Sequence, residues 1–225
     1  MYLEQDSDFG RFRLKSSCSR GSSLRSAALF LVACLWPNLV PAQATNPLGH
    51  VAVGEFAPRF VADGADGRRH ALADYQGKII VLEWTSPVCP YTALKYRHGL
   101  MQSLQTRAAR QGVVWITIDT AAVGRPGYLT PQAARARIAA QSARVTAFVF
   151  DTDGRIGRAY GARVTPTVFI INTAGRLAYQ GAIDDEPSLG SPGSGDHVSA
   201  ALDDLRAGRS VRLAQTRPYG CAVEY

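Results

Sequence analysis

The sequence predicts an α/β fold in which a mixed central β-sheet is flanked by helices. Residues 79–84 form a nearly continuous apolar run rich in β-branched side chains, which is typical of a strand buried on both faces. A helix-compatible segment, 91–111, joins this run to a second apolar run at 113–119, so the two strands should be parallel. Two further strands, 164–172 and 176–180, are separated by a short Gly-containing turn that favours an antiparallel hairpin.

The remaining elements follow from turn signals and short apolar runs. The strands expected at 59–61 and 70–72 form an N-terminal hairpin extension around the turn at 63–67, because that turn is rich in Asp and Gly. Further along, the pattern indicates a helix at 132–142, a strand at 147–150, a short helix at 155–160 and a last helix at 197–207.

Composition places the chain among ordinary globular proteins. It has 225 residues, of which 46% are hydrophobic and 19% charged, enough for one domain with a full core. The formal net charge is +7, but no basic run follows residue 44, so nucleic-acid binding receives little support.

The first 44 residues differ in kind from the rest. Basic residues precede an apolar run at 27–36, and Ala42-Gln43-Ala44 supplies a small-x-small cleavage pattern. We therefore expect residues 1–44 to be a signal peptide and residues 45–225 to be one exported domain, periplasmic or secreted. The apolar run is too short to span a membrane. An alternative is that Cys34, in a sequence that resembles a lipoprotein box, becomes lipidated.

Removal of the leader leaves two cysteines, Cys89 and Cys221, which are either a redox pair or one reactive thiol and one structural residue. Cys89 follows the break after the first buried strand and precedes Pro90, which is favoured at the first position of a helix. The orphan N–H groups of a helix N-terminus lower a thiol pKa. Cys89 is the leading candidate for a reactive thiol, against the alternative of a small buried hydrophobe.

The order of elements resembles the thioredoxin fold, and the N-terminal hairpin resembles its redoxin branch, which includes the alkyl hydroperoxide reductase and thiol-specific antioxidant (peroxiredoxin-like) proteins. The resemblance rests on the run from Glu83 to Tyr91, Gly161 to Pro166, Gly181 to Asp185 and Tyr219-Gly220-Cys221. It implies that Pro166, after Thr165, is a cis-proline that lies opposite Cys89 and shapes the substrate groove.

Two departures leave the chemistry open. Thr92 stands where a dithiol thioredoxin has its second cysteine, and Leu82 stands where a peroxiredoxin motif has its proline. We therefore expect an oxidoreductase that acts through Cys89 on a peroxide or a protein disulfide, with a thiol protein or a small thiol as electron donor. The alternative is a non-enzymatic thioredoxin-fold peptide-binding module in which Cys89 is buried and unreactive.

Several residues could support the thiol, and each has a second interpretation. Cys221 is a resolving cysteine or a passive tail residue, and Thr92 hydrogen-bonds the thiolate or only packs. Glu83 resembles the buried acid of thioredoxins, although exposure or a salt bridge is an equal alternative. Trp84 is expected to be a platform under the active loop. Arg163 either stabilises a thiolate, as the peroxiredoxin arginine does, or is an exposed side chain.

No cofactor or metal is expected. The four histidines, His50, His70, His98 and His197, show no metal-ligand spacing with one another or with the cysteines. Asp184-Asp185-Glu186 is expected to be a solvated turn after the last strand.

Overall fold

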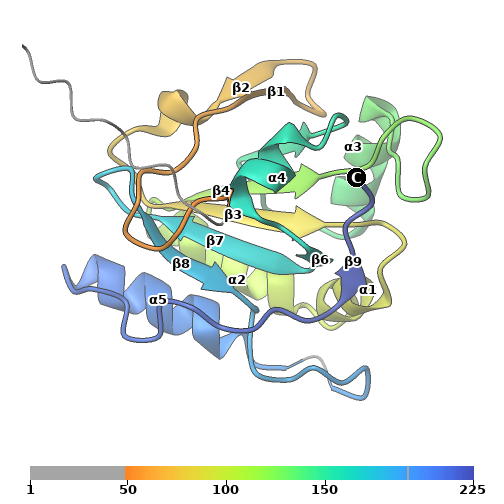
Figure 1. Cartoon of the computed structure of the whole chain (residues 1–225). Helices are drawn as coiled ribbons and strands as arrows, with labels where there is room; N and C mark the ends of the chain where they lie inside the picture. The colour runs from red at the N-terminus through yellow and green to blue at the C-terminus, as the bar shows by residue number, and fades with distance from the viewer. Residues whose placement is uncertain (1–48, 192) are drawn as a thin grey trace, which may run out of the picture. The chain divides into compact units, whose positions relative to one another are not determined.

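The computed structural model describes residues 49–191 and 193–225 (Figure 1). The predicted signal peptide and the alternative lipidation at Cys34 lie outside the described residues. At the centre is a five-stranded sheet with the order β5-β4-β3-β7-β8. Its strands are β3 (Ile80–Thr85), β4 (Val114–Asp119), β5 (Ala147–Phe150), β7 (Thr167–Ile171) and β8 (Leu177–Gly181).

Both directions of strand pairing occur in this sheet. β3 and β4 are parallel, as are β4 and β5, whereas β7 pairs antiparallel with both β3 and β8. The mixed α/β sheet predicted from the sequence is therefore confirmed. The register brings Thr85, the last residue of β3, opposite Asp119, the last residue of β4. Side chains at the carboxyl ends of the two parallel strands thus share one edge of the sheet.

The N-terminal hairpin is present but displaced by up to two residues from the predicted positions. It consists of β1 (Val61–Asp63) and β2 (Arg69–Ala71), which pair antiparallel and are followed by a short 3₁₀ helix, η1 (Leu72–Tyr75). Strand boundaries of such short elements are poorly marked by sequence alternation.

The single helix predicted for residues 91–111 is wrong, because the structure has two. α1 (Pro90–Arg97) ends before Gly99, whose φ of +77° begins α2 (Leu100–Arg110) with a residue in the left-handed region. Glycine adopts that conformation without the cost of a Cβ clash, so the chain turns there. The other helices are α3 (Pro131–Ala140), α4 (Arg155–Tyr160) and α5 (Asp196–Arg206).

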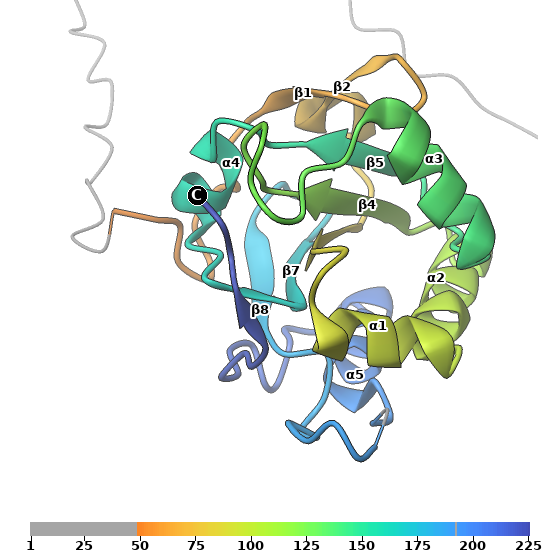
Figure 2. The ribbon, with the colours of Figure 1, turned by 90° about the vertical axis from the view of Figure 1, so that its right-hand side faces the viewer.

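The sheet separates two apolar layers, and the helices α1, α2, α3 and α5 lie on the side opposite to α4 and the N-terminal hairpin (Figure 2). Alternate side chains of β3 point into the two layers. Val81 packs with α2 and α5, whereas Leu82 and Trp84 pack with α4 and the hairpin. Because β3 is central, all six of its residues are buried. This packing fixes the end of β3, from which the loop to Cys89 departs.

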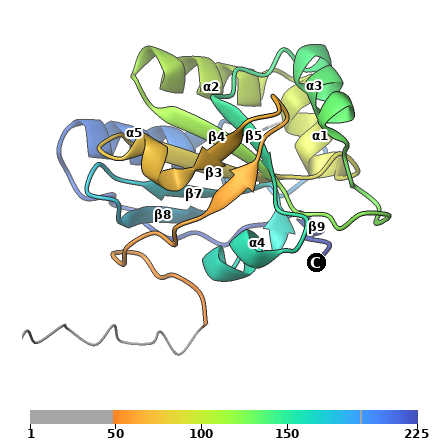
Figure 3. The same cartoon turned by 90° about the horizontal axis from the view of Figure 1, so that it is seen from above.

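The strand predicted at 164–172 is interrupted by a cis peptide bond between Thr165 and Pro166. The part before it, β6 (Val164–Thr165), leaves the central sheet and pairs antiparallel with β9 (Cys221–Ala222) from the C-terminal tail. The tail therefore returns to the middle of the domain, and Figures 1 and 3 show β9 and the C-terminus close to α4. Near its end, the Tyr225 hydroxyl donates a hydrogen bond to the carbonyl oxygen of Ala162.

Candidate functional site

Cys89 caps the N-terminus of α1, as the following proline predicts. Its backbone is extended, Pro90 occupies the first turn, and its carbonyl oxygen accepts the first helical hydrogen bond from the Ala93 N–H at 3.0 Å. The side chain is fully buried, with 0% of its surface exposed. The sulfur therefore lies at the positive end of a helix but away from bulk water.

The segment around the cis-proline brings Thr165 to the Cys89 sulfur and, through strand pairing, brings Cys221 close to it. The Cys89 thiol donates a 3.0 Å hydrogen bond to the carbonyl oxygen of Thr165, and Thr165 is the strand partner of Cys221. Cys221 also lies close enough to Cys89 to lower the pKa of the Cys89 thiol. The two cysteines, both free thiols, are thus held together by β6 and β9 rather than by a disulfide.

The surroundings shift the pKa values of the two thiols in opposite directions. Burial by itself raises the pKa of Cys89, but hydrogen bonds from the Cys221 thiol and from the backbone N–H of Thr92 outweigh burial, so that the pKa is lowered. Burial and the neighbouring Cys89 together raise the pKa of Cys221 to about 12. Cys89 is therefore the thiol that ionises first, and Cys221 remains protonated as its hydrogen-bond donor.

Thr92 contributes its backbone, not its hydroxyl. The side chain is buried, and its Oγ1 has no hydrogen-bond partner among the described residues. The predicted hydroxyl bond to the thiolate is absent from the site, and what Thr92 supplies to Cys89 is its N–H.

Glu83 is a buried acid, so the alternatives of exposure or a salt bridge are wrong. Its carboxylate accepts hydrogen bonds from Trp115 Nε1 at 2.8 Å, Tyr96 Oη at 3.0 Å and Thr117 Oγ1 at 3.2 Å, and a longer one from Gln105. No ion pair to Glu83 occurs in the described part of the chain. Burial raises the pKa of Glu83 in spite of these donors.

Trp84 lies on the opposite face of β3 from Glu83. Its ring packs against Tyr160 and Phe169, and its Nε1 donates to the hydroxyl of Thr120 at 3.1 Å. Thr120 in turn donates to Asp151, whose carboxylate also accepts the N–H groups of Ile156 and Gly157 in the first turn of α4. Trp84 is therefore a core residue that ties β3 to the loop after β4.

Asp119 is a third buried acid, at the end of β4. Only 3% of its surface is exposed, and burial raises its pKa to about 7 even though the charge of Arg137 opposes this shift. Nothing in the sequence singled out this residue, because it ends an otherwise ordinary buried strand.

Arg163 is exposed, which agrees with the second interpretation of this residue. Its side chain acts electrostatically on Tyr225, and its carbonyl oxygen accepts the Val223 N–H at 3.0 Å. The backbone of Arg163 thus extends the β6–β9 pairing, while no thiolate-stabilising role for its guanidinium is observed.

The prediction of a solvated turn at 184–186 is wrong for Asp184, which is buried beside Lys95, whereas Asp185 is exposed. The Lys95 Nζ lies 2.9 and 2.8 Å from the two carboxylate oxygens, and the hydroxyl of Tyr219 donates to the same carboxylate. Sequence reasoning missed all three residues. No local signal marks this cluster, because Lys95 and Asp184 are 89 positions apart in sequence.

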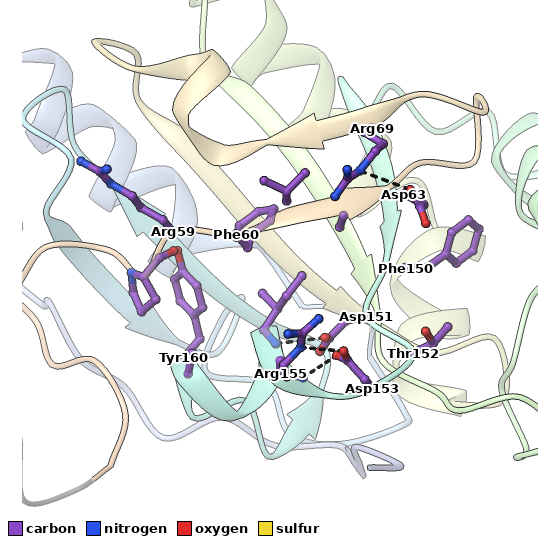
Figure 4. A pocket seen from close by; sticks show the side chains of 15 residues that line it. Arg59, Phe60, Asp63, Arg69, Phe150, Asp151, Thr152, Asp153, Arg155 and Tyr160 are labelled. Atoms are coloured by element: carbon purple, nitrogen blue, oxygen red, sulfur yellow. Dashed lines mark hydrogen bonds and ion pairs between the residues drawn. The ribbon is translucent and has the colours of Figure 1, made fainter.

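Cavities border the described part of the domain outside the buried sulfur. One, of about 600 Å³, lies beside the tail and is lined by Val164, Asp185, His197, Arg217 and Gly220 among others. The second, of about 420 Å³, lies between β1 and α4, and Figure 4 shows ion pairs of Arg69 with Asp63 and of Arg155 with Asp153 at its rim. The first is adjacent to the segment that carries Cys221, because Gly220 lines it.

Comparison with known protein families agrees with this arrangement. Residues 53–180, more than half of the chain, match the family model described as AhpC/TSA family. The chain belongs to the AhpC/TSA family. The matched region of this AhpC/TSA protein includes Cys89 and the cis-proline, and it ends before the tail that carries Cys221.

Individual curated relatives are named as oxidoreductases. The chain is 29% identical over 127 residues to a protein named thiol-disulfide oxidoreductase ResA from Geobacillus thermodenitrificans, a match that covers 56% of this chain and 67% of the relative. The chain spans about two thirds of the length of the curated relatives it matches. The predicted enzyme class, an oxidoreductase, is confirmed by the family and these relatives.

Solved structures confirm the predicted thioredoxin-like fold. A hypothetical protein from Sinorhizobium meliloti 1021 is 25% identical with a TM-score of 0.70, covering 78% of this chain and 95% of that one. A putative thioredoxin from Neisseria meningitidis is 19% identical with a TM-score of 0.50, covering 67% and 92%. Within the described residues of this AhpC/TSA protein, no helix is long and apolar enough to cross a bilayer.

Proposed function

We propose that this protein is an exported thiol–disulfide oxidoreductase in which Cys89 is the nucleophile and Cys221 the resolving thiol. The observation that carries the proposal is the pairing of β9 with β6, which sets Cys221 opposite Thr165, the residue whose carbonyl oxygen accepts the hydrogen bond of the Cys89 thiol. Relatives named thiol-disulfide oxidoreductases support the reaction class.

The geometry supports a two-step exchange. The Cys89 thiolate attacks one sulfur of a substrate disulfide, forms a mixed disulfide and releases the other substrate sulfur as a thiolate. Cys221 then loses its proton to solvent or to the released thiolate and attacks Cys89, which forms the Cys89–Cys221 disulfide and releases the second substrate thiol. The protein dithiol is oxidised by two electrons, and the substrate disulfide is reduced.

Disulfide exchange is favoured over peroxide reduction by the residues around the sulfur. The exposed Arg163 does not supply a cation to Cys89, and Leu82 stands where the peroxiredoxin motif has proline. The expected partners are accordingly a disulfide substrate and a thiol electron donor. Export rests on the leader pattern that ends at Ala44, and it is tested by N-terminal sequencing of the processed protein, which should begin at Thr45.

The experiment that tests the reaction maps disulfides after the reduced protein has been treated with one equivalent of oxidised glutathione. We expect a Cys89–Cys221 bond in the wild type, and a glutathione adduct on Cys89 in Cys221→Ser. Cys89→Ser is the control and should form neither product rapidly at neutral pH. If Cys89 resists both glutathione and alkylation, the buried thiol is inert, and the alternative of a non-enzymatic peptide-binding module replaces this proposal.

A further inference from the structure

Asp184 is a fully enclosed carboxylate beside the tail that carries Cys221. It follows β8, its side chain has 0% exposure, and it accepts backbone N–H groups from Glu186 at 3.1 Å and Gly195 at 3.3 Å. A Cβ on Gly193 would collide with this carboxylate, so the loop closes tightly over it. Buried charges persist only when they are paired and hydrogen-bonded, and these contacts orient the carboxylate toward two side chains.

The first of these side chains, Lys95, connects Asp184 to the helix that Cys89 caps. The ammonium lies 2.8 Å from Oδ2 and 2.9 Å from Oδ1, and the Lys95 side chain has 1% exposure. Separation of a buried pair would leave two uncompensated charges, which is costly. The pair therefore favours a single arrangement of α1 relative to the loop after β8.

The second side chain, Tyr219, connects Asp184 to the tail. Its hydroxyl donates to Asp184, and its ring centre lies 5.3 Å from the Lys95 ammonium and 5.9 Å from the ring of Tyr91 in an edge-on arrangement. Burial raises the pKa of Tyr219, so the hydroxyl stays protonated as a donor. Tyr219 precedes Cys221 by two residues, so a contact that fixes its hydroxyl also fixes the path of the chain into β9.

We propose that Asp184 is a positioning residue for the Cys89–Cys221 pair: through Lys95 and Tyr219 it clamps the tail to α1 and thereby places Cys221 against Cys89. The inference rests on the proposed function, because it concerns how often the resolving thiol meets the nucleophile. Proximity of this kind is expressed as an effective concentration.

The effective concentration is measured at equilibrium with glutathione. Oxidised glutathione and the reduced protein give the Cys89–Cys221 disulfide and two molecules of reduced glutathione, so both sulfur atoms of the oxidant leave as thiols and the protein loses two electrons and two protons. The ratio of oxidised to reduced protein at fixed glutathione concentrations then reports how strongly the fold favours the pair.

Tyr219→Phe is the main test, because it removes the hydroxyl that Asp184 accepts and keeps the ring beside Lys95 and Tyr91. We expect the effective concentration of the pair to fall about tenfold, the size of one hydrogen bond to a charged group. Tyr75→Phe is the matched control: it removes a hydroxyl that hydrogen-bonds His70 at 2.9 Å in the N-terminal region of the domain, and the effective concentration should not change. Asp184→Asn is expected to act in the same direction but also to lower stability.

A second readout separates positioning from general destabilisation. The Cys221 thiol lowers the pKa of Cys89, so loosening the tail by Tyr219→Phe should raise the pKa of Cys89. This effect should vanish in a Cys221→Ala background, where no thiol remains to be positioned. A change that acted only on overall stability would be the same in both backgrounds.

The outcomes distinguish this inference from the function on which it rests. Absence of any Cys89–Cys221 disulfide in the wild type would overturn the two-cysteine cycle itself. A wild-type disulfide that forms with the same effective concentration in Tyr219→Phe and Tyr75→Phe would leave that cycle intact and overturn the positioning role of Asp184.

Discussion

The Cys89 thiol donates a 3.0 Å hydrogen bond to the carbonyl oxygen of Thr165. Only the protonated thiol can donate this bond, so ionisation exchanges it for bonds that the sulfur accepts, from the Thr92 N–H and the Cys221 thiol. The same sulfur therefore has a partner in either protonation state. Cys89 can thus be buried without leaving its polar group unpaired.

Cys221→Ala should raise the pKa of Cys89. The wild-type pKa is lowered in part by the Cys221 thiol, and alanine cannot donate to the thiolate. The rate of iodoacetamide alkylation as a function of pH, in the wild type and in Cys221→Ala, measures the change. An unchanged or lower pKa in the variant would show that the Cys221 thiol does not stabilise the thiolate.

Gly220→Ala should disrupt the pairing of the cysteines. Gly220 has a φ of +136°, and a Cβ there would collide with the Thr165 carbonyl oxygen, so alanine forces β9 away from β6. We expect a large decrease in the yield of the Cys89–Cys221 disulfide with oxidised glutathione. Gly208→Ala is the matched control, because Gly208 also has a positive φ but has no atoms near the position of a Cβ. Equal yields in the two variants would contradict the prediction.

Thr92→Val should leave the pKa of Cys89 unchanged and raise stability by about 1 kcal/mol, because the buried hydroxyl has no partner among the described residues while the N–H remains. Thr117→Val is the contrasting variant. Its hydroxyl donates to Glu83 at 3.2 Å, so its loss should lower the free energy of unfolding by about 1 to 3 kcal/mol. Urea unfolding measures both changes. A raised pKa of Cys89 in Thr92→Val would assign the hydroxyl to the thiolate.

Asp119→Asn should make stability less dependent on pH. Burial raises the pKa of Asp119 from 3.8 to about 7, so the folded state favours the neutral acid. This preference for the neutral acid contributes up to about 4 kcal/mol to the free energy of unfolding below pH 4, and the contribution is lost as the pH rises to 7. Asparagine imitates the neutral acid, and the variant should therefore match the wild type at pH 4 and exceed it at pH 7.5.

Urea unfolding at pH 4, 5.5 and 7.5 measures the pH dependence. Asp63→Asn is the control, because the Asp63 side chain is 84% exposed and its removal should change stability little at any of these pH values. A stability difference between Asp119→Asn and the wild type that stays constant with pH would refute the prediction.

The sequence predicted the parts of the site that local patterns determine. The β-branched run identified β3, and Pro90 placed Cys89 at a helix N-cap, since both signals lie within a few residues of the feature they mark. Gly99 was not recognised as a break because the helical pattern continues on both sides of it, and an isolated glycine is tolerated within helices.

Other parts of the site depend on residues that are distant in sequence. Alternation could not decide the environment of Glu83, because both faces of a central strand are buried and its donors come from separate elements. An acidic run normally indicates a solvated turn, and only the fold brings Lys95 to Asp184. The pairing of Thr165 with Cys221 involves strands of two residues, too short to show any periodicity.

The β6–β9 pair also determines how a large molecule can reach the sulfur. An extended polypeptide that bound by adding a strand to β6 would require the same backbone groups of Thr165 that Cys221 already occupies. Such a substrate competes with a segment of the same chain, whose local concentration does not fall when the protein is diluted. A polypeptide substrate must therefore displace the tail before it can bind in this way, so its apparent affinity includes the cost of that displacement.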